Sequence, residues 1–274
     1  DYILLVRVVL DVIVTSLIYS LDMSIIVIES IGFCATHTIS NCLRIDGQNY
    51  VSHGTRDFKK LTRIGDSNLS FHQFHSQMIE LQKQYLHCIS VHSNFNPIDM
   101  IKEITDSDTD TKFFALMRKS QRNQILSCFY WLINEFLNGR ELLTDILSNM
   151  YQKNSSLFKQ MSLPNNMITC FLLYAYRRVC SKNIILADSA EKVFFMEEII
   201  ADPLKFALDI GATDCQDLSL KVERGPSHKS KVKEYKFISN VDEILEVMNE
   251  KLSLNYANQT FNIDSAENFC LNKS

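Results

Sequence analysis

The sequence predicts a mainly α-helical protein of the α+β class, a multi-helix bundle or irregular helical array with a small C-terminal β-hairpin–helix unit. Glycine and proline are scarce, with 7 and 4 among 274 residues, whereas all-β folds need many of both for their turns. Apolar residues recur at three- and four-residue spacing through residues 70–210, which is typical of amphipathic helices. Polar stops between these runs are short and no fixed-period repeat is present, so a bundle is favoured over a solenoid.

Four regions follow from these patterns. Residues 1–68 form an apolar N-terminal segment with polar loops, and residues 69–210 form the helical domain. Residues 211–254 form a basic hairpin plus helix, and residues 255–274 form a polar, flexible tail. The chain begins at Asp1 rather than Met, which we interpret as a fragment or processed product of a larger protein.

Residues 2–33 are the most hydrophobic stretch of the chain. A membrane span needs roughly 20 consecutive apolar residues, but Arg7, Asp11 and Asp22 interrupt this one. Each charge at the centre of a span costs roughly 2.5–3.5 kcal/mol. We therefore expect core packing rather than a membrane span. The stretch is expected to form either two packed helices, over 3–20 and 23–33, or β-rich segments, an option that the many Val and Ile residues keep open.

The helical domain is predicted from its apolar spacing. One apolar face runs from Phe71 to Ile89 and predicts a helix over 70–92. Pro97 suits the first turn of a short helix over 97–105. The run from Met167 to Cys180 is apolar on almost every side, which predicts a helix in the centre of the core. Further helices are expected from Phe113 onward, over 125–136, 142–150 and 189–200, after Pro203, and over 241–252.

A basic hairpin is the sharpest local feature of the sequence. Leu218, Leu220 and Val222 alternate with polar residues, and a second strand is expected over 231–238. The chain carries a net charge of −4, so a basic cluster here can hold phosphates or nucleic acid. The alternative is a solvated hairpin whose lysines discourage strand-to-strand aggregation. The residues expected to bind phosphate are Arg224, His228, Lys229, Lys231 and Lys233.

An acidic–basic triplet in the same hairpin suggests one enzymatic alternative. Glu234 and Lys236 form an E-x-K on a predicted strand, and Asp217 lies at the start of the preceding strand. This order resembles the core of PD-(D/E)xK nucleases over about residues 188–262. The resemblance implies that Asp217 and Glu234 hold Mg²⁺ and that Lys236 stabilises developing phosphate charge. The chain departs from the pattern because no proline precedes Asp217, and Asp214 competes for the same role.

Cysteine and histidine patterns predict no metal site. None of the eight cysteines forms a C-x-x-C pair, which favours buried free thiols in a reducing compartment. His75 and His87 would lie roughly 18 Å apart on one continuous helix, and zinc ligands must all lie close to the metal. His72, His75, His87 and His92 are therefore interpreted as solvated or helix-packing residues.

The sequence favours a binding protein over an enzyme. It contains no phosphate-binding P-loop, dinucleotide-binding, serine-hydrolase or zinc-protease motif. We therefore expect a non-enzymatic helical scaffold or adaptor that binds other proteins through its helical faces. It is expected to be intracellular, cytoplasmic or nuclear, without cofactor or metal. The alternative is a nucleic-acid-associated protein that uses the hairpin 221–236, with or without Mg²⁺-dependent cleavage.

Overall fold

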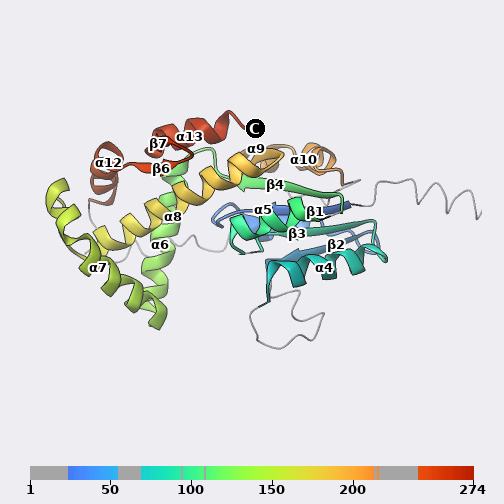
Figure 1. Ribbon diagram of the computed structural model, residues 1–274, viewed down its shortest axis with the longest axis horizontal. Coiled ribbons are helices and arrows are strands. Elements are labelled where there is room, and N and C mark those ends of the chain that lie inside the picture. Colours follow the sequence, from blue (N-terminus) through green and yellow to red (C-terminus); the bar gives the residue numbers. More distant parts are fainter. Residues whose placement is uncertain (1–23, 55–68, 94, 108, 213–214, 216–239) are drawn as a thin grey trace, which may run out of the picture. The chain divides into compact units, whose positions relative to one another are not determined.

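The fold contains a five-stranded β-sheet with the strand order β2-β3-β1-β4-β5 (Figure 1). The computed structural model describes residues 24–54, 69–93, 95–107, 109–212, 215 and 240–274. The prediction of a mainly α-helical bundle is therefore wrong, because the chain has an α/β fold in which helices connect the strands of a sheet. The strands are β1 (Ser24–Glu29), β2 (Asn49–His53), β3 (His87–Val91), β4 (Thr111–Met117) and β5 (Lys192–Phe195).

Three neighbouring strands pair in parallel. β1 pairs with β3 from Ser24↔His87 onward, and β2 pairs with β3 from Asn49↔His87 onward. Every residue of β1 and β3 is buried, as expected for strands of a parallel sheet that is covered on both faces. Such strands lack the alternation of apolar and polar residues that marks a half-buried strand. Of the stretch 23–33, where helix and strand were both open, the described residues 24–33 form β1 followed by a loop.

The chain divides into two compact units. Unit 1 consists of Asp1–Glu29, Thr36–Phe114 and Ile199–Leu218, and unit 2 consists of Ser30–Ala35, Ala115–Glu198 and Ser219–Ser274. In unit 1, α2 (Thr36–Cys42) packs on β2 and β3, while α4 (Phe71–Gln82) packs on β1, β3 and α5 (Pro97–Asp106). Unit 1 also contains α10 (Pro203–Asp209), and α9 (Met196–Ala201) crosses the boundary between the units.

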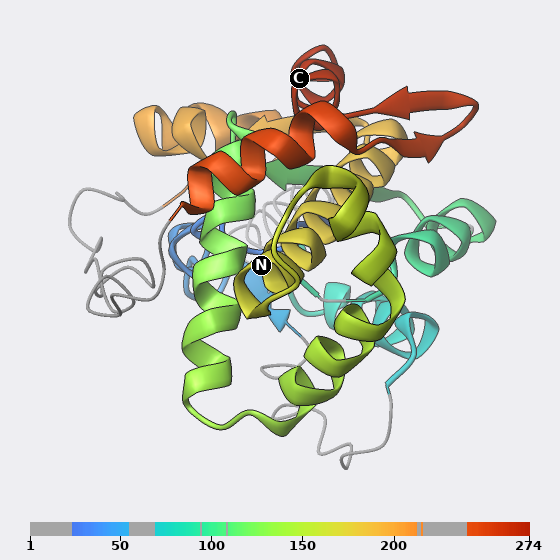
Figure 2. The same ribbon diagram turned by 90° about the vertical axis from the view of Figure 1, so that its left-hand side faces the viewer.

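Unit 2 is built around one apolar helix. α8 (Met167–Ser189) packs against α6 (Gln121–Leu137), α7 (Glu141–Met161), α12 (Val241–Lys251) and α13 (Ile263–Leu271) (Figure 1 and Figure 2). Most α8 residues are buried, so the predicted core helix from Met167 is confirmed. The strands β6 (Leu254–Tyr256) and β7 (Gln259–Phe261) form an antiparallel pair before α13.

Several local predictions need correction. The helix expected over 70–92 ends at Gln82, and the chain continues into β3. The face that begins at Phe113 is β4, and the helix expected over 189–200 is β5 followed by α9. Residues 255–274 contain β7 and the capped helix α13 where a tail was expected. Among the described residues, no helix is long and apolar enough to cross a membrane.

Two buried histidines should make unit 1 sensitive to acid. Burial lowers the pKa of His75 and of His87 below 6.5, so the unfolded chain binds more protons than the folded one as the pH falls. Stability should therefore decrease from about pH 6.5 downward, by up to about 1.4 kcal/mol per pH unit for each histidine. In His75→Gln, urea unfolding measured between about pH 7 and pH 5 should show a shallower pH dependence. An unchanged slope would contradict this.

Candidate functional site

The loop Ser30–Ala35 follows β1 directly and has an unusual backbone. Gly32, Phe33 and Ala35 adopt positive φ angles of 89°, 65° and 53°. A left-handed conformation costs a residue with a side chain roughly 1–3 kcal/mol, and such residues cluster at binding and catalytic sites. Two of these three residues carry a Cβ atom, so the surrounding structure must hold the loop in this shape.

The loop presents backbone N–H groups without protein partners. The N–H of Gly32 donates to Ser30 Oγ at 3.0 Å. In the part of the chain that the structure describes, no acceptor takes the N–H of Phe33, Cys34 or Ala35. Successive N–H groups in alternating or left-handed backbone form concave nests that bind anions. The loop is therefore a candidate anion-binding site.

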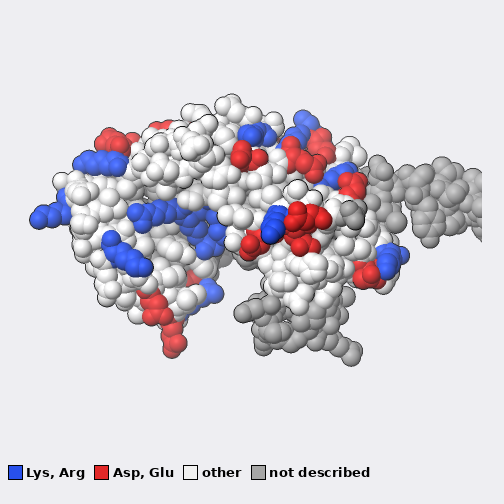
Figure 3. All heavy atoms as spheres, viewed as in Figure 1, with Lys and Arg blue, Asp and Glu red and all other residues white. Residues whose placement is uncertain are grey.

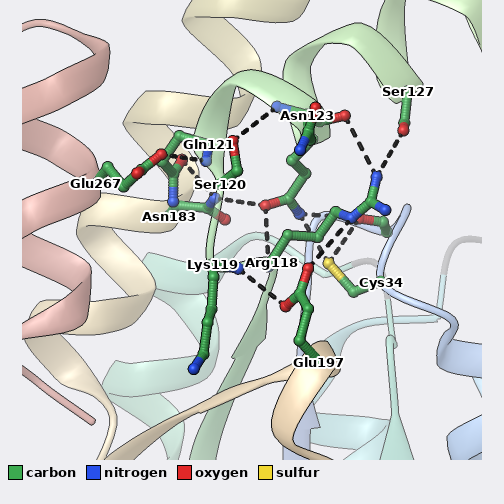
Figure 4. Close-up of polar contacts among 12 residues, drawn as sticks. Cys34, Arg118, Lys119, Ser120, Gln121, Asn123, Ser127, Asn183, Glu197 and Glu267 are labelled. Carbon is green, nitrogen blue, oxygen red and sulfur yellow. Dashed lines mark hydrogen bonds and ion pairs between the residues drawn. The ribbon is translucent and has the colours of Figure 1, made fainter. Parts of the chain in front are cut away.

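Two basic residues follow β4 in the same unit (Figure 4). The guanidinium of Arg118 donates to Ser127 Oγ at 2.9 Å, and its Nε lies 3.8 Å from Glu197 Oε1. The backbone N–H of Lys119 donates to Glu197 Oε2 at 3.0 Å, and its Nζ lies 2.8 Å from Glu198 Oε1. Arg118 is thus fixed in position by a neutral hydroxyl on α6 and a carboxylate on α9.

A buried cluster of amide side chains holds the loop Ser30–Ala35 through contacts with Gly32 and Cys34 (Figure 4). Gln124 Nε2 donates to Gly32 O at 3.0 Å and contacts Cys34 Sγ at 2.9 Å. Asn183 Nδ2 donates to Gln124 Oε1 at 3.0 Å and to Gln121 Oε1 at 2.8 Å. All three amide residues are fully buried, with exposed fractions of 0%. These four hydrogen bonds connect α6, α8 and the loop, while Gln121 Nε2 and Asn183 Oδ1 meet no partner among the described residues.

An aromatic contact adds to this support. The Phe33 ring lies 5.9 Å from the Trp131 ring on α6, centroid to centroid. The N-terminus of α6 is itself occupied, because the N–H of Gln121 donates to Glu267 Oε2 of α13 at 2.8 Å. The backbone N–H of Gln121 is therefore not available to a ligand, in contrast to the N–H groups of Phe33 to Ala35.

Cys34 should be chemically inert although it lies in the loop. Burial raises the pKa of its thiol to about 12, which leaves only about one molecule in 10⁴ as thiolate at about pH 8. Iodoacetamide should therefore leave Cys34 unmodified in the native protein and modify it after unfolding. Cys215, which is partly exposed, serves as the internal control. Mass spectrometry that finds both cysteines alkylated at similar rates in the native protein would contradict this.

Unit 1 carries a separate cluster of titratable groups. Glu29, which ends β1, is 3% exposed, and its Oε2 accepts the backbone N–H of Ser93 at 2.9 Å. His92, which follows β3, has its Nδ1 3.7 Å from Glu29 Oε1. The ring of His53, which ends β2, lies 5.8 Å from the His92 ring, and His37 stacks on His53 at 3.6 Å. Because β1, β2 and β3 are parallel, their carboxyl ends bring these groups to one edge.

The cluster has the composition of an acid–base site. An imidazole beside a buried carboxylate can accept a proton and be stabilised as imidazolium. The sequence interpretation missed this arrangement because it placed His92 on a helix, whereas His92 follows a strand. A polar residue directly after an apolar run, as at Glu29 and His92, was the available signal.

The site residues expected from the sequence are not among the residues that the structure describes. Asp217, Glu234 and Lys236 lie outside the described residues, as do the phosphate-binding residues of the basic hairpin, Arg224, His228, Lys229, Lys231 and Lys233. The nuclease-like arrangement and its Mg²⁺ therefore stay untested predictions. Within the described ranges, no group of three or more His, Cys, Asp or Glu residues is placed to hold a metal ion.

Comparison with known proteins gives one likeness in fold. No protein-family model matches the sequence, and no curated protein is similar enough to match. Among solved structures, a sulfotransferase from Alicyclobacillus acidocaldarius is similar, with a TM-score of 0.41 and 12% identity. The likeness covers 82% of this chain and 94% of that one.

The prediction of a non-enzymatic helical scaffold is wrong. It rested on a mainly helical core without catalytic groups, whereas the chain has a parallel sheet with polar clusters following its strands. The described residues give no support to the nucleic-acid alternative either.

Proposed function

We propose that this chain is an enzyme that binds a phosphate- or sulfate-bearing donor at the loop Ser30–Ala35 and transfers a group from it. The observation that carries the proposal is the run of three unpartnered N–H groups, from Phe33 to Ala35, in a loop with left-handed residues. The loop follows β1, which has β3 on one side and β4 on the other, so the strand order reverses there. Ligands of α/β proteins bind at such switch points.

Arg118 supplies the positive charge that the loop lacks. Its guanidinium is held by Ser127 at 2.9 Å and faces Glu197 at 3.8 Å. A phosphate or sulfate group can replace Glu197 as the partner of the guanidinium, because charge-assisted hydrogen bonds from arginine to such groups are short and strong.

Unit 1 carries a candidate acid–base pair of its own. His92 beside the buried Glu29 has the arrangement of a general base and the carboxylate that orients it. His92 is proposed to accept a proton from a hydroxyl group within unit 1. The two groups are proposed independently, each from contacts within its own unit.

Sulfo transfer and phosphoryl transfer should be assayed side by side, since the loop and Arg118 suit either tetrahedral anion.

A matched pair of glycine variants tests donor binding. Gly32→Ala places a Cβ at φ 89° in the loop and should raise the Kd for inorganic phosphate or sulfate about tenfold, which is about 1.4 kcal/mol. Gly139→Ala places a Cβ at φ 80° in unit 2, where nothing lies within 4 Å of it. This control should lose similar stability but keep the affinity. Isothermal titration that finds equal affinities, or no saturable binding by the wild type, would contradict the proposal.

We also propose a reducing compartment, cytoplasmic or nuclear. Support comes from the eight cysteines, none of which is placed in a disulfide in the described structure and seven of which are buried. Thiol titration of the denatured, unreduced protein from its native source should find eight thiols. A lower number would indicate disulfides and contradict this assignment.

A further inference from the structure

Two adjacent arginines on α8 differ from the other arginines of unit 2. In the described part of this unit, three arginines lie within 4 Å of a carboxylate, at 3.8, 2.6 and 3.1 Å: Arg118, Arg122 and Arg140. Arg177 and Arg178 have no carboxylate partner among the described residues. Their positive charge is therefore not neutralised within the described protein.

Arg177 is held in place by a neutral group. Its guanidinium donates to Asn154 Oδ1 of α7 at 3.1 Å. Asn154 is itself buried, and its Nδ2 donates to Met150 O at 3.0 Å. Partial burial lowers the pKa of Arg177 from its usual value. The guanidinium is thus positioned by α7 while its charge stays available to a ligand.

Arg178 has an orphaned donor. One terminal nitrogen lies 3.4 Å from the hydroxyl of Tyr174, one turn earlier on α8. Its Nε is buried and meets no acceptor among the described residues. A solvated surface arginine would expose this N–H to water. The Nε of Arg118 is also buried without an acceptor, but Arg118 has a carboxylate 3.8 Å away, whereas Arg178 has none among the described residues.

The distribution of Lys and Arg side chains on the surface agrees with the lack of carboxylate partners at Arg177 and Arg178. Figure 3 shows Lys and Arg side chains gathered in a band across unit 2, over the middle of α8. An arginine offers a planar set of N–H donors that matches carboxylate, sulfate or phosphate oxygens in pairs. An oxyanion that binds Arg178 would satisfy the orphaned Nε, and the neighbouring positive charge of Arg177 would add to its attraction.

We propose that Arg177 and Arg178 form an oxyanion-recognition site on α8, which binds a terminal carboxylate, sulfate or phosphate group of a ligand. The loop Ser30–Ala35 is a different site, and the assignment stands without the proposed donor binding. Tyr174 adds a hydroxyl beside the guanidinium of Arg178. In an enzyme, such a site would select an anionic acceptor.

Side-chain NMR of arginine tests the site directly. The Nε–Hε signal of Arg178, assigned by its loss in Arg178→Gln, is followed at constant ionic strength during titration with acetate, sulfate and methyl phosphate. We expect a saturable shift with at least one probe, and the probes separate carboxylate from tetrahedral anions. Arg177→Gln should weaken that binding about tenfold or more, while Arg122→Gln, which removes an ion-paired arginine, should leave it unchanged.

Two outcomes would overturn the proposal. One is the absence of a saturable Arg178 shift with every probe, and the other is equal affinity in Arg177→Gln and wild type. Backbone signals of Phe33 to Ala35 in the same sample report donor binding, so failure at one site is distinguished from failure at the other. The melting temperature of Arg178→Gln should be unchanged or higher, because an orphaned donor is removed. A clear fall would indicate a structural role and count against the proposal.

Discussion

Replacing His92 with glutamine should lower the rate of group transfer by about 10²–10⁴-fold, the usual contribution of a general base. Glutamine can hydrogen-bond but cannot accept the proton of an attacking hydroxyl group. Phosphate affinity should stay unchanged, because the contacts of the His92 ring described above are with Glu29 and His53 and not with the N–H groups of Phe33 to Ala35. Turnover and the Kd for phosphate are measured on the same preparation.

His72→Gln is the matched control for this change. His72 lies in unit 1 and pairs with Glu103 at 2.6 Å, but its side chain is 70% exposed. Its replacement should leave turnover within about twofold of wild type. A His92→Gln variant that turns over as fast as His72→Gln would remove His92 from the proposed mechanism.

Replacing Asn183 with leucine should lower the free energy of unfolding by about 2–4 kcal/mol. Asn183 is fully buried and donates to both Gln121 and Gln124. Leucine fills a similar volume but leaves two buried amide oxygens without these donors, and each loss costs about 1–3 kcal/mol. Urea unfolding followed by circular dichroism gives the difference.

Asn123→Ala provides the comparison on the neighbouring helix. Asn123 is exposed on α6, so its removal should change stability by no more than about 0.5 kcal/mol. If Asn183→Leu were equally mild, the amide cluster would not hold α6 and α8 together as described. Phosphate affinity should also fall in Asn183→Leu, because Gln124 then loses the partner that aims it at Gly32.

The helices of unit 2 could be predicted from the sequence because their signals are local. Ser120 and Asn166 cap α6 and α8 by accepting the N–H groups of Asn123 and Thr169. The run from Met167 is longer than a strand of ordinary length. Helix propensity, N-terminal capping and apolar spacing all indicate a helix at α6 and α8, so these two helices could be predicted from the sequence.

The sheet was not predicted because apolar and polar residues do not alternate along β1, β3 and β4. Apolar spacing from Phe71 continues into β3, and no Gly or Pro separates Gln82 from His87. β4 is buried along almost its whole length, so Phe113 and Met117 fit a helical pattern as well as a strand. Short apolar runs of this kind cannot be assigned by periodicity alone.

The candidate sites were even less accessible to sequence reasoning. Gly32 marks a turn, but nothing in a sequence shows that Phe33 and Ala35 adopt positive φ angles. The cluster of Glu29, His53 and His92 depends on strand pairing across residues far apart in the chain. Once the parallel strands are known, these residues are predictable as neighbours at the carboxyl ends.

Backbone NMR of the full chain during titration with inorganic phosphate tests whether the loop Ser30–Ala35 is the anion site. We expect the largest amide shifts, saturable and common in their Kd, at Phe33, Cys34 and Ala35. These are the residues whose N–H groups lack a protein acceptor. If those three amides do not shift while the protein binds phosphate elsewhere, or if no amide shifts at all, the loop is not the anion site.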